Sequence, residues 1–116
     1  MRALALAAAL AAATLTTPAH AAPMTGECRY ALATVSSPFP TIVLTAHAVT
    51  TAPALEVGIS CWVSDGGSGY ANGSNPGVAV VATGTGTVFR LPFRVCEQHW
   101  ARYVDGTTYT SPIACV

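Results

Sequence analysis

The sequence predicts an all-β fold: a small antiparallel β-sandwich of immunoglobulin-like topology, with six to seven strands and two disulfides. Short runs rich in Val, Thr, Ile, Tyr and Phe are separated by Gly and Pro, which is typical of strands joined by turns. Many short antiparallel strands in so small a chain favour a sandwich. The pattern contains no sustained amphipathic helix between these runs, which disfavours a parallel α/β sheet.

The N-terminus predicts export. Arg2 precedes an Ala- and Leu-rich run of 13 residues, and Ala19-His20-Ala21 has the small-x-small pattern of a cleavage site. A membrane-spanning helix needs about 20 apolar residues. We therefore interpret residues 1–21 as a signal peptide and expect no membrane insertion after its removal. Residues 22–116 would then form a single secreted domain with an extracellular location.

Several segments of the mature chain are interpreted as strands. In Leu55–Val63 the apolar residues alternate with polar ones, so Cys61 is expected to face the core while Ser60 and Trp62 face the other way. Gly84-Thr85-Gly86 fits the loop of a hairpin. The expected strands are Cys28–Val35, Thr41–Thr50, Leu55–Val63, Gly77–Thr83 and Thr87–Phe93.

Asp65–Pro76 is rich in Gly, Ser and Asn and contains one aromatic residue, Tyr70. Long loops in compact domains are uncommon and are usually functional or disordered. Tyr, Ser, Gly and Asn are also the residues of adaptable binding loops. Two interpretations stay open: a flexible connection, or a binding loop that presents Tyr70.

Asp105-Gly106 predicts a two-residue type I′ turn. Facing residues of such a hairpin have numbers that sum to 105 + 106 = 211, which places Cys96 opposite Cys115 and within disulfide range. Pro112 falls opposite His99. The remaining pair, Cys28 and Cys61, would form the second disulfide, as expected in an exported chain.

Residues Glu97–Tyr103 have a second interpretation. Apolar pairs recur every four residues in this segment, which is also the spacing of a short helix. We favour the strand because it explains the turn, the proline and the cysteine register together. On that strand the side chains on the disulfide side, Trp100 and Tyr109, should face the core, with Arg102 at its rim, and the outward set should be Glu97, His99, Ala101, Tyr103 and Asp105.

Charge and ligand types limit the partners. Residues 22–116 contain four arginines, no lysine and five acids, a net charge of 4 − 5 = −1. Without a basic stripe, nucleic acid is not an expected partner. Without a C-x-x-C pair, and with His47 and His99 as the remaining histidines, we expect neither a metal site nor a cofactor.

Function is predicted from residue types that often anchor interfaces. Trp, Tyr and Arg gather in the last third of the chain, and no catalytic motif is present. We expect a secreted, non-catalytic binding domain for an extracellular protein or glycan. The candidate binding residues are Tyr70, His99, Trp100, Arg102 and Tyr103.

Two alternatives remain. The first is a protein-type hydrolase inhibitor, which needs an exposed, rigid surface formed by Trp100, Arg102 and Tyr103, or by Tyr70. The second is a minimal secreted hydrolase, in which His99 would act as a base oriented by Glu97 or Asp105.

In size and in its two disulfides the chain resembles small secreted β-sandwiches of actinobacteria, among them the chromoprotein carriers of enediynes and several hydrolase inhibitors. The segment "HWARYV" is similar to the Trp-Arg-Tyr triplet of small bacterial amylase inhibitors. Here Ala101 splits the triplet, and the cysteine spacing also departs from that family. No active residue is therefore carried over from it.

Overall fold

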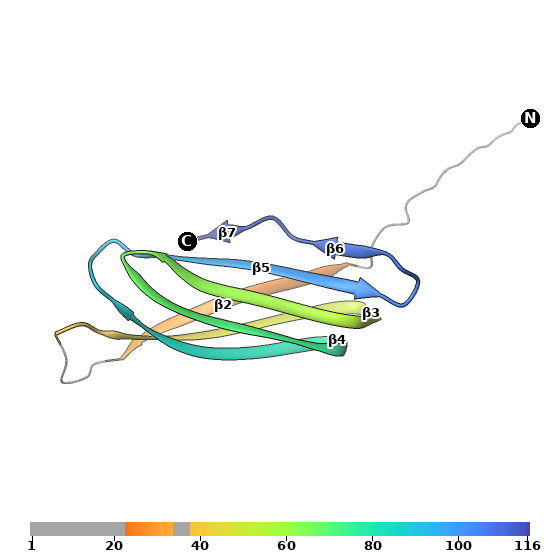
Figure 1. Cartoon of the computed structure of the whole chain (residues 1–116), viewed down its shortest axis with the longest axis horizontal. Helices are drawn as coiled ribbons and strands as arrows, with labels where there is room; N and C mark the ends of the chain where they lie inside the picture. Colours follow the sequence, from red (N-terminus) through yellow and green to blue (C-terminus); the bar gives the residue numbers. More distant parts are fainter. Residues whose placement is uncertain (1–22, 34–37) are drawn as a thin grey trace, which may run out of the picture.

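A computed structural model describes residues 23–33 and 38–116, which form one antiparallel sheet (Figure 1). The strand order is β2-β3-β5-β6, with β4 paired to β3 and β7 paired to β5. The predicted signal peptide, residues 1–21, lies outside the described part. Within that part, no helix is long and apolar enough to cross a membrane. The strands are β2 (Met24–Ala33), β3 (Thr41–Asp65), β4 (Gly67–Val88), β5 (Arg94–Tyr103), β6 (Thr108–Thr110) and β7 (Ala114–Cys115).

The two longest strands, β3 and β4, fold back on themselves. A straight strand with the 25 residues of β3 would extend about 80 Å, yet its two ends meet. The N–H of Val88 donates to the carbonyl of Pro40 (3.0 Å), before β3, and the next N–H, of Phe89, donates to the carbonyl of Gly66 (2.7 Å), after β3. The ladder between β3 and β4 is accordingly interrupted midway.

This folding gives the sheet two facing layers. The first layer contains β2, residues 41–50 of β3 and residues 79–88 of β4. The second contains residues 54–65 of β3 and 67–77 of β4, together with β5, β6 and β7. Aliphatic side chains of both layers fill the space between them. The largest fully buried residues are Ile42, Leu44, Val57, Ile59 and Cys61.

The two disulfides join Cys28 to Cys61 and Cys96 to Cys115, the pairs that the sequence predicts. The first links the two layers, and the second ties β7 to β5. The all-β antiparallel class with two disulfides is thus confirmed. The immunoglobulin-like sandwich is not confirmed, because the strands belong to one continuous sheet that curls into a half-barrel.

The expected hairpin around Gly84-Thr85-Gly86 is wrong, because these residues lie within β4 and pair with β3. Both glycines face the opposite layer. A Cβ added to Gly84 would overlap the carbonyl oxygen of Tyr70, and one added to Gly86 would overlap that of Ser68. Glycine is needed here for close backbone approach rather than for a turn.

The expected loop over Asp65–Pro76 is also wrong, because the segment is strand apart from Gly66. Only Gly66, with φ of 74°, forms a turn, and β4 begins at the next residue. The segment pairs with β3, so that Tyr70 lies opposite Trp62 and Asn72 opposite Ser60. Gly67, Gly69 and Gly73 face the opposite layer and allow close packing, whereas Asn72 is exposed on the outer face.

β5 is a strand, so the short helix over Glu97–Tyr103 is wrong. The turn that follows has three residues rather than two. The N–H of Tyr103 donates to the carbonyl of Thr107 (2.8 Å), and Gly106, with φ of 92°, donates to the carbonyl of Tyr103 (3.0 Å). This is the common three-residue loop with glycine in the left-handed region.

The three-residue turn shifts the pairing of β5 with β6 by one residue from the predicted register. An extra residue near Pro112 restores the predicted register between β5 and β7. Ser111 donates its N–H to the carbonyl of His99 (2.8 Å), so the predicted pairing of Pro112 with His99 is wrong. Beyond this irregularity, Cys96 faces Cys115 as predicted. Two opposite one-residue errors therefore leave the cysteine pair in place.

Candidate functional site

The outer face of the second layer gathers aromatic and amide side chains. Directly paired residues of antiparallel strands share one face of a sheet. Tyr70 pairs with Trp62, Asn72 with Ser60, Ser60 with Gln98, and Gly58 with Trp100. These pairs form three neighbouring rows across β4, β3 and β5. We call this surface the aromatic face, and it consists of Ser60, Trp62, Tyr70, Asn72, Gln98 and Trp100.

The indole of Trp100 lies over Gly58 of β3. A Cβ added to Gly58 would overlap atoms of the indole ring, including Cζ2 and Nε1. Trp100 and Trp62 are both partly exposed, and Tyr70 is 65% exposed. The absence of a side chain at Gly58 thus makes room for the indole.

Polar groups lie between the two tryptophans. Trp100 pairs with Gly58, four residues before Trp62 on β3, so the two indoles stand about 13 Å apart along the strand. Ser60 donates its hydroxyl to Oδ1 of Asn72 (2.5 Å), and Nε2 of Gln98 donates to the carbonyl of Ser111 (3.1 Å). These bonds fix both amide side chains on the face.

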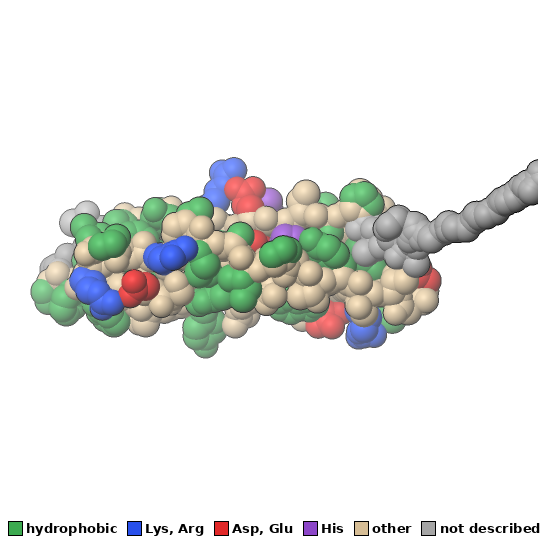
Figure 2. All heavy atoms as spheres, turned by 90° about the horizontal axis from the view of Figure 1, so that it is seen from above, with side chains coloured by type: hydrophobic (Ala, Val, Ile, Leu, Met, Phe, Trp, Pro, Cys, Tyr) green, Lys and Arg blue, Asp and Glu red, His purple; other side chains and the backbone are tan. Residues whose placement is uncertain are grey.

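Charge is sparse on this face. Arg102 is beside Trp100 and lies 3.8 Å from Glu56, both on exposed positions at the end of the face. On the face seen in Figure 2, charged side chains form small separate spots among apolar and uncharged groups. The aromatic face therefore offers stacking and hydrogen bonding more than electrostatic attraction.

The structure brings three of the five predicted binding residues together and separates the other two. Tyr70, Trp100 and Arg102 share the outer face of the second layer. His99 and Tyr103 point the other way and are 8% and 4% exposed. Sequence reasoning missed Trp62 as a candidate, although the alternation of Leu55–Val63 places it on this face.

The predicted orientation of β5 is therefore wrong. Glu97, His99, Ala101 and Tyr103 face the core rather than solvent, whereas Trp100 is on the outer side. The prediction assumed that the Cys96–Cys115 side of the hairpin is the core side. The opposite layer covers the other side instead. Tyr109 does pack against the core, because it pairs with Ala101 and not with Arg102.

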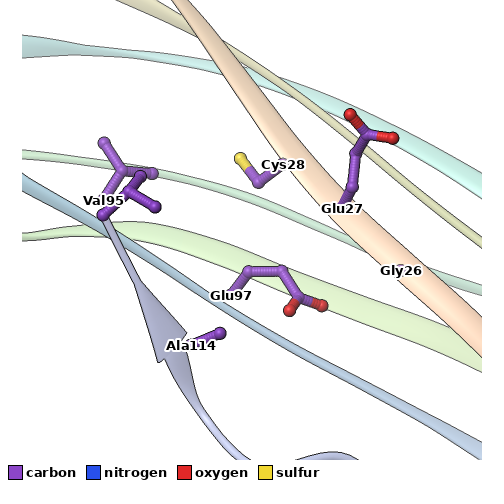
Figure 3. Close-up of a pocket in the computed structure, with 7 residues that line it drawn as sticks. Gly26, Glu27, Cys28, Val95, Glu97 and Ala114 are labelled. Atoms are coloured by element: carbon purple, nitrogen blue, oxygen red, sulfur yellow. The ribbon is translucent and has the colours of Figure 1, made fainter.

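Glu97 and His99 form a buried pair. Nδ1 of His99 lies 2.5 Å from Oε1 of Glu97. A cavity of about 180 Å³ lies next to the pair, between β2 and β7. Figure 3 shows Glu97 extending from β5 toward Gly26, whereas Glu27 extends away from it. The lining residues are Gly26, Glu27, Cys28, Val95, Glu97, Ala114 and Val116.

The hydroxyl near this pair is engaged with backbone. Oγ of Ser111 accepts the N–H of His99 (2.9 Å) and donates to the carbonyl of Pro112 (2.9 Å). Asp105, the other acid considered for His99, accepts hydrogen bonds from Thr107 in the turn. Within residues 23–33 and 38–116, no group of three or more His, Cys, Asp or Glu side chains is placed to hold a metal ion.

A second cavity, of about 270 Å³, lies where β3 begins and β4 ends. Its lining is mainly apolar and includes exposed Leu32, Phe39, Phe89 and Leu91.

Comparisons with protein-family models, curated proteins and solved structures return no match. The case for a function therefore rests on these side-chain arrangements.

Proposed function

We propose that this protein is a secreted, non-catalytic binding domain whose aromatic face takes an extracellular glycan. The observation that carries the proposal is the placement of Trp62, Tyr70 and Trp100 on one exposed face of a hydrogen-bonded sheet. Aromatic rings combine a large apolar surface with little conformational freedom. The apolar C–H face of a sugar ring can stack on such a ring while its hydroxyls bond to polar neighbours.

The polar groups on the face suit this chemistry. Among the described residues, the amide NH₂ of Asn72 and the carbonyl oxygen of Gln98 are not used in the bonds that fix these side chains. One is a donor and the other an acceptor, the two capacities that sugar hydroxyls complement. Both stand between the indoles, where an extended glycan stacked on both rings would pass.

A protein ligand is the second candidate. Arg102 lies next to Trp100 on β5, and Trp, Tyr and Arg are the residues that most often dominate protein interfaces. A hydrolase inhibitor would use this surface without Tyr103, which is buried on the other side. The glycan is favoured because the central polar groups of the surface, Ser60, Asn72 and Gln98, are uncharged.

A non-catalytic role is favoured by where the titratable groups lie. The Glu97–His99 pair is enclosed between the layers, and the nearest serine hydroxyl, Ser111, is bonded to backbone on both sides. The aromatic face itself carries the Arg102–Glu56 pair at one end. Ligand binding on the aromatic face would therefore use stacking and hydrogen bonding alone.

The test is affinity electrophoresis through gels that contain soluble glucan, xylan or glycol-chitin. We expect at least one polysaccharide to retard the protein. Trp100→Ala and Tyr70→Ala should each weaken binding about tenfold or more, since truncation of an aromatic hot-spot residue costs about 2 kcal/mol or more. Val81→Ala, at an exposed apolar side chain on β4 in the other layer, is the control. Circular dichroism verifies that each variant is folded.

The outcomes separate the candidates. Retardation that Trp100→Ala leaves unchanged contradicts the proposal. If no polysaccharide binds but a purified extracellular hydrolase is inhibited in a manner that depends on Trp100, the protein ligand is correct. Export is tested separately by the mass of the protein in the culture medium. This mass should correspond to a chain that starts at Ala22.

A further inference from the structure

β2 has a free edge. It pairs with β3 along all ten of its residues, and no strand of residues 23–33 and 38–116 pairs with its other side. The strand contains no proline and no bulge in its ladder with β3. A long, regular edge of this kind is a template for pairing with another chain.

The hydrogen-bond pattern shows which groups are available at that edge. The carbonyl of Pro23 accepts the N–H of Thr51 (3.2 Å), so residue 23 and every second residue after it bond to β3. In an antiparallel ladder the alternate residues direct their N–H and C=O groups to the opposite side. The residues whose backbone groups point to the free edge are therefore Met24, Gly26, Cys28, Tyr30 and Leu32.

We propose that β2 pairs with β2 of a second copy of this chain, antiparallel and across a two-fold axis at Cys28. Paired residue numbers then sum to 56. Glu27 of each copy lies opposite Arg29 of the other, Gly26 opposite Tyr30, and Met24 opposite Leu32. All five edge-directed residues find partners of the same kind, as a two-fold interface requires.

Charge selects this register. Glu27 and Arg29 are exposed on the outer face of β2, where they lie 2.6 Å apart within one chain. At a sum of 56 both cross-strand pairs join opposite charges, which stabilise a sheet. A shift of two residues in one direction would put Glu27 opposite Glu27, and a shift in the other would put Arg29 opposite Arg29.

Shape supports the same register. Tyr30 and Leu32 are 46% and 49% exposed, although their partners in β3, Leu44 and Ile42, are fully buried. In the pair of copies, each Tyr30 lies beside a glycine, Gly26, at the mouth of the 180 Å³ cavity next to Glu97. Apolar surface that one chain leaves exposed is thus covered by the second.

The pairing would make the molecule bivalent. Antiparallel edge pairing joins the first layers of the two copies into one six-stranded sheet. The two-fold axis is perpendicular to this sheet. Both second layers then lie on the same side of that sheet, and both aromatic faces point in the same direction. Two linked sites raise the apparent affinity for a repetitive ligand without any new contact. The pairing itself does not depend on what that ligand is.

The test is sedimentation velocity of the disulfide-intact protein from 1 to 200 μM in low salt, concentrations at which a micromolar Kd is resolved. We expect a monomer–dimer equilibrium for the unaltered chain and at least about tenfold weaker dimerisation for Glu27→Arg and for Arg29→Glu. An equimolar mixture of these two variants should form the heterodimer, because opposite charges then face again. The double variant Glu27→Arg/Arg29→Glu should dimerise like the original.

Arg94→Glu is the matched control, since Arg94 is exposed on β5 of the second layer and pairs with Asp65 of β3. It should leave the equilibrium unchanged. The dimer should separate on a non-reducing denaturing gel, because each Cys28 is bonded to Cys61 of its own chain. A monomer at every concentration, or single charge reversals that dimerise normally, would overturn the proposal.

Discussion

Nδ1 of His99 lies 2.5 Å from Oε1 of Glu97, and both side chains are enclosed beneath the backbone of Gly26 in the facing layer. Each is 8% exposed, so the pair sits where an unpartnered polar group would destabilise the fold. The contact also explains the glycine. A Cβ at residue 26 would overlap the imidazole and come within 3.0 Å of the carboxylate.

Gly26→Ala should therefore destabilise the protein. The added methyl group must displace the His99 ring, and overpacking of a closed interior reduces stability by about 1–3 kcal/mol. Urea unfolding of the variant beside Thr25→Ala, an exposed neighbour on the same strand, measures the difference. A free energy of unfolding equal to that of Thr25→Ala would mean that the layers are not in contact at this point.

Deleting residues 67–74 should prevent folding. These residues form half of a ladder with β3 and supply the backbone against which Gly84 and Gly86 pack. A flexible connection would instead tolerate the deletion, since the entropy of a loop changes slowly with its length. Circular dichroism and thermal unfolding of the deleted chain distinguish the two, with Tyr70→Ala, at a 65% exposed side chain, as a variant that should stay within about 0.5 kcal/mol of the original.

The alternation of apolar and polar residues correctly predicts the strands that have one face on the core and the other exposed. Leu55–Val63 is such a strand, and its alternation places Cys61 inward and Trp62 outward, as found. The same reasoning fails for Gly67–Val88. A Cβ on Gly67, Gly69, Gly84 or Gly86 would overlap backbone of the opposite layer. The sequence of β4 itself contains no sign of that layer. Composition alone therefore indicates loops where the structure has strand.

The orientation of β5 fails for a related reason. Alternation places Trp100 and His99 on opposite faces of β5 but does not show which face is turned to the core. The disulfide indicated the face of Trp100, which is wrong. Cys96 is on the outer side, opposite Trp62. For the candidate site, the residue types are predictable from the sequence. Their gathering depends on two pairings that the sequence does not indicate, because β5 with β3 places Trp100 near Trp62 and β4 with β3 adds Tyr70.

Removing the disulfide between the layers should destabilise the protein more than removing the terminal one. Cys28–Cys61 spans 33 residues and Cys96–Cys115 spans 19, and chain entropy gives roughly 3–4 kcal/mol for each, larger for the longer loop. Cys61 and Cys96 are both buried, so either double variant leaves a cavity and the longer loop decides the order. Urea midpoints of the two double variants test the order. An equal or larger loss for Cys96→Ala/Cys115→Ala would contradict it.

The turn after β5 should make stability depend on acid pH. The hydroxyl and N–H of Thr107 donate to Oδ1 of Asp105 (2.6 and 2.9 Å), and they hold the pKa of this carboxyl below its ordinary value of 3.8, the hydroxyl contributing most. A carboxyl whose pKa is lowered by folding stabilises the folded state above its unfolded pKa, and this contribution is lost as pH falls through the folded pKa.

Thr107→Val should raise the pKa of Asp105 toward 3.8 and reduce stability at neutral pH. Its stability should approach that of the original chain as the pH falls below the pKa of Asp105 in the folded protein, because the carboxyl is then protonated in both proteins and in both states. Thr108→Val, at the adjacent residue on β6, is the control. Carbon-detected NMR titration of the Asp105 carboxyl and urea unfolding at several pH values measure the two effects. A Thr107→Val chain whose deficit persists unchanged at low pH would show that Thr107 acts through packing rather than through the Asp105 carboxylate.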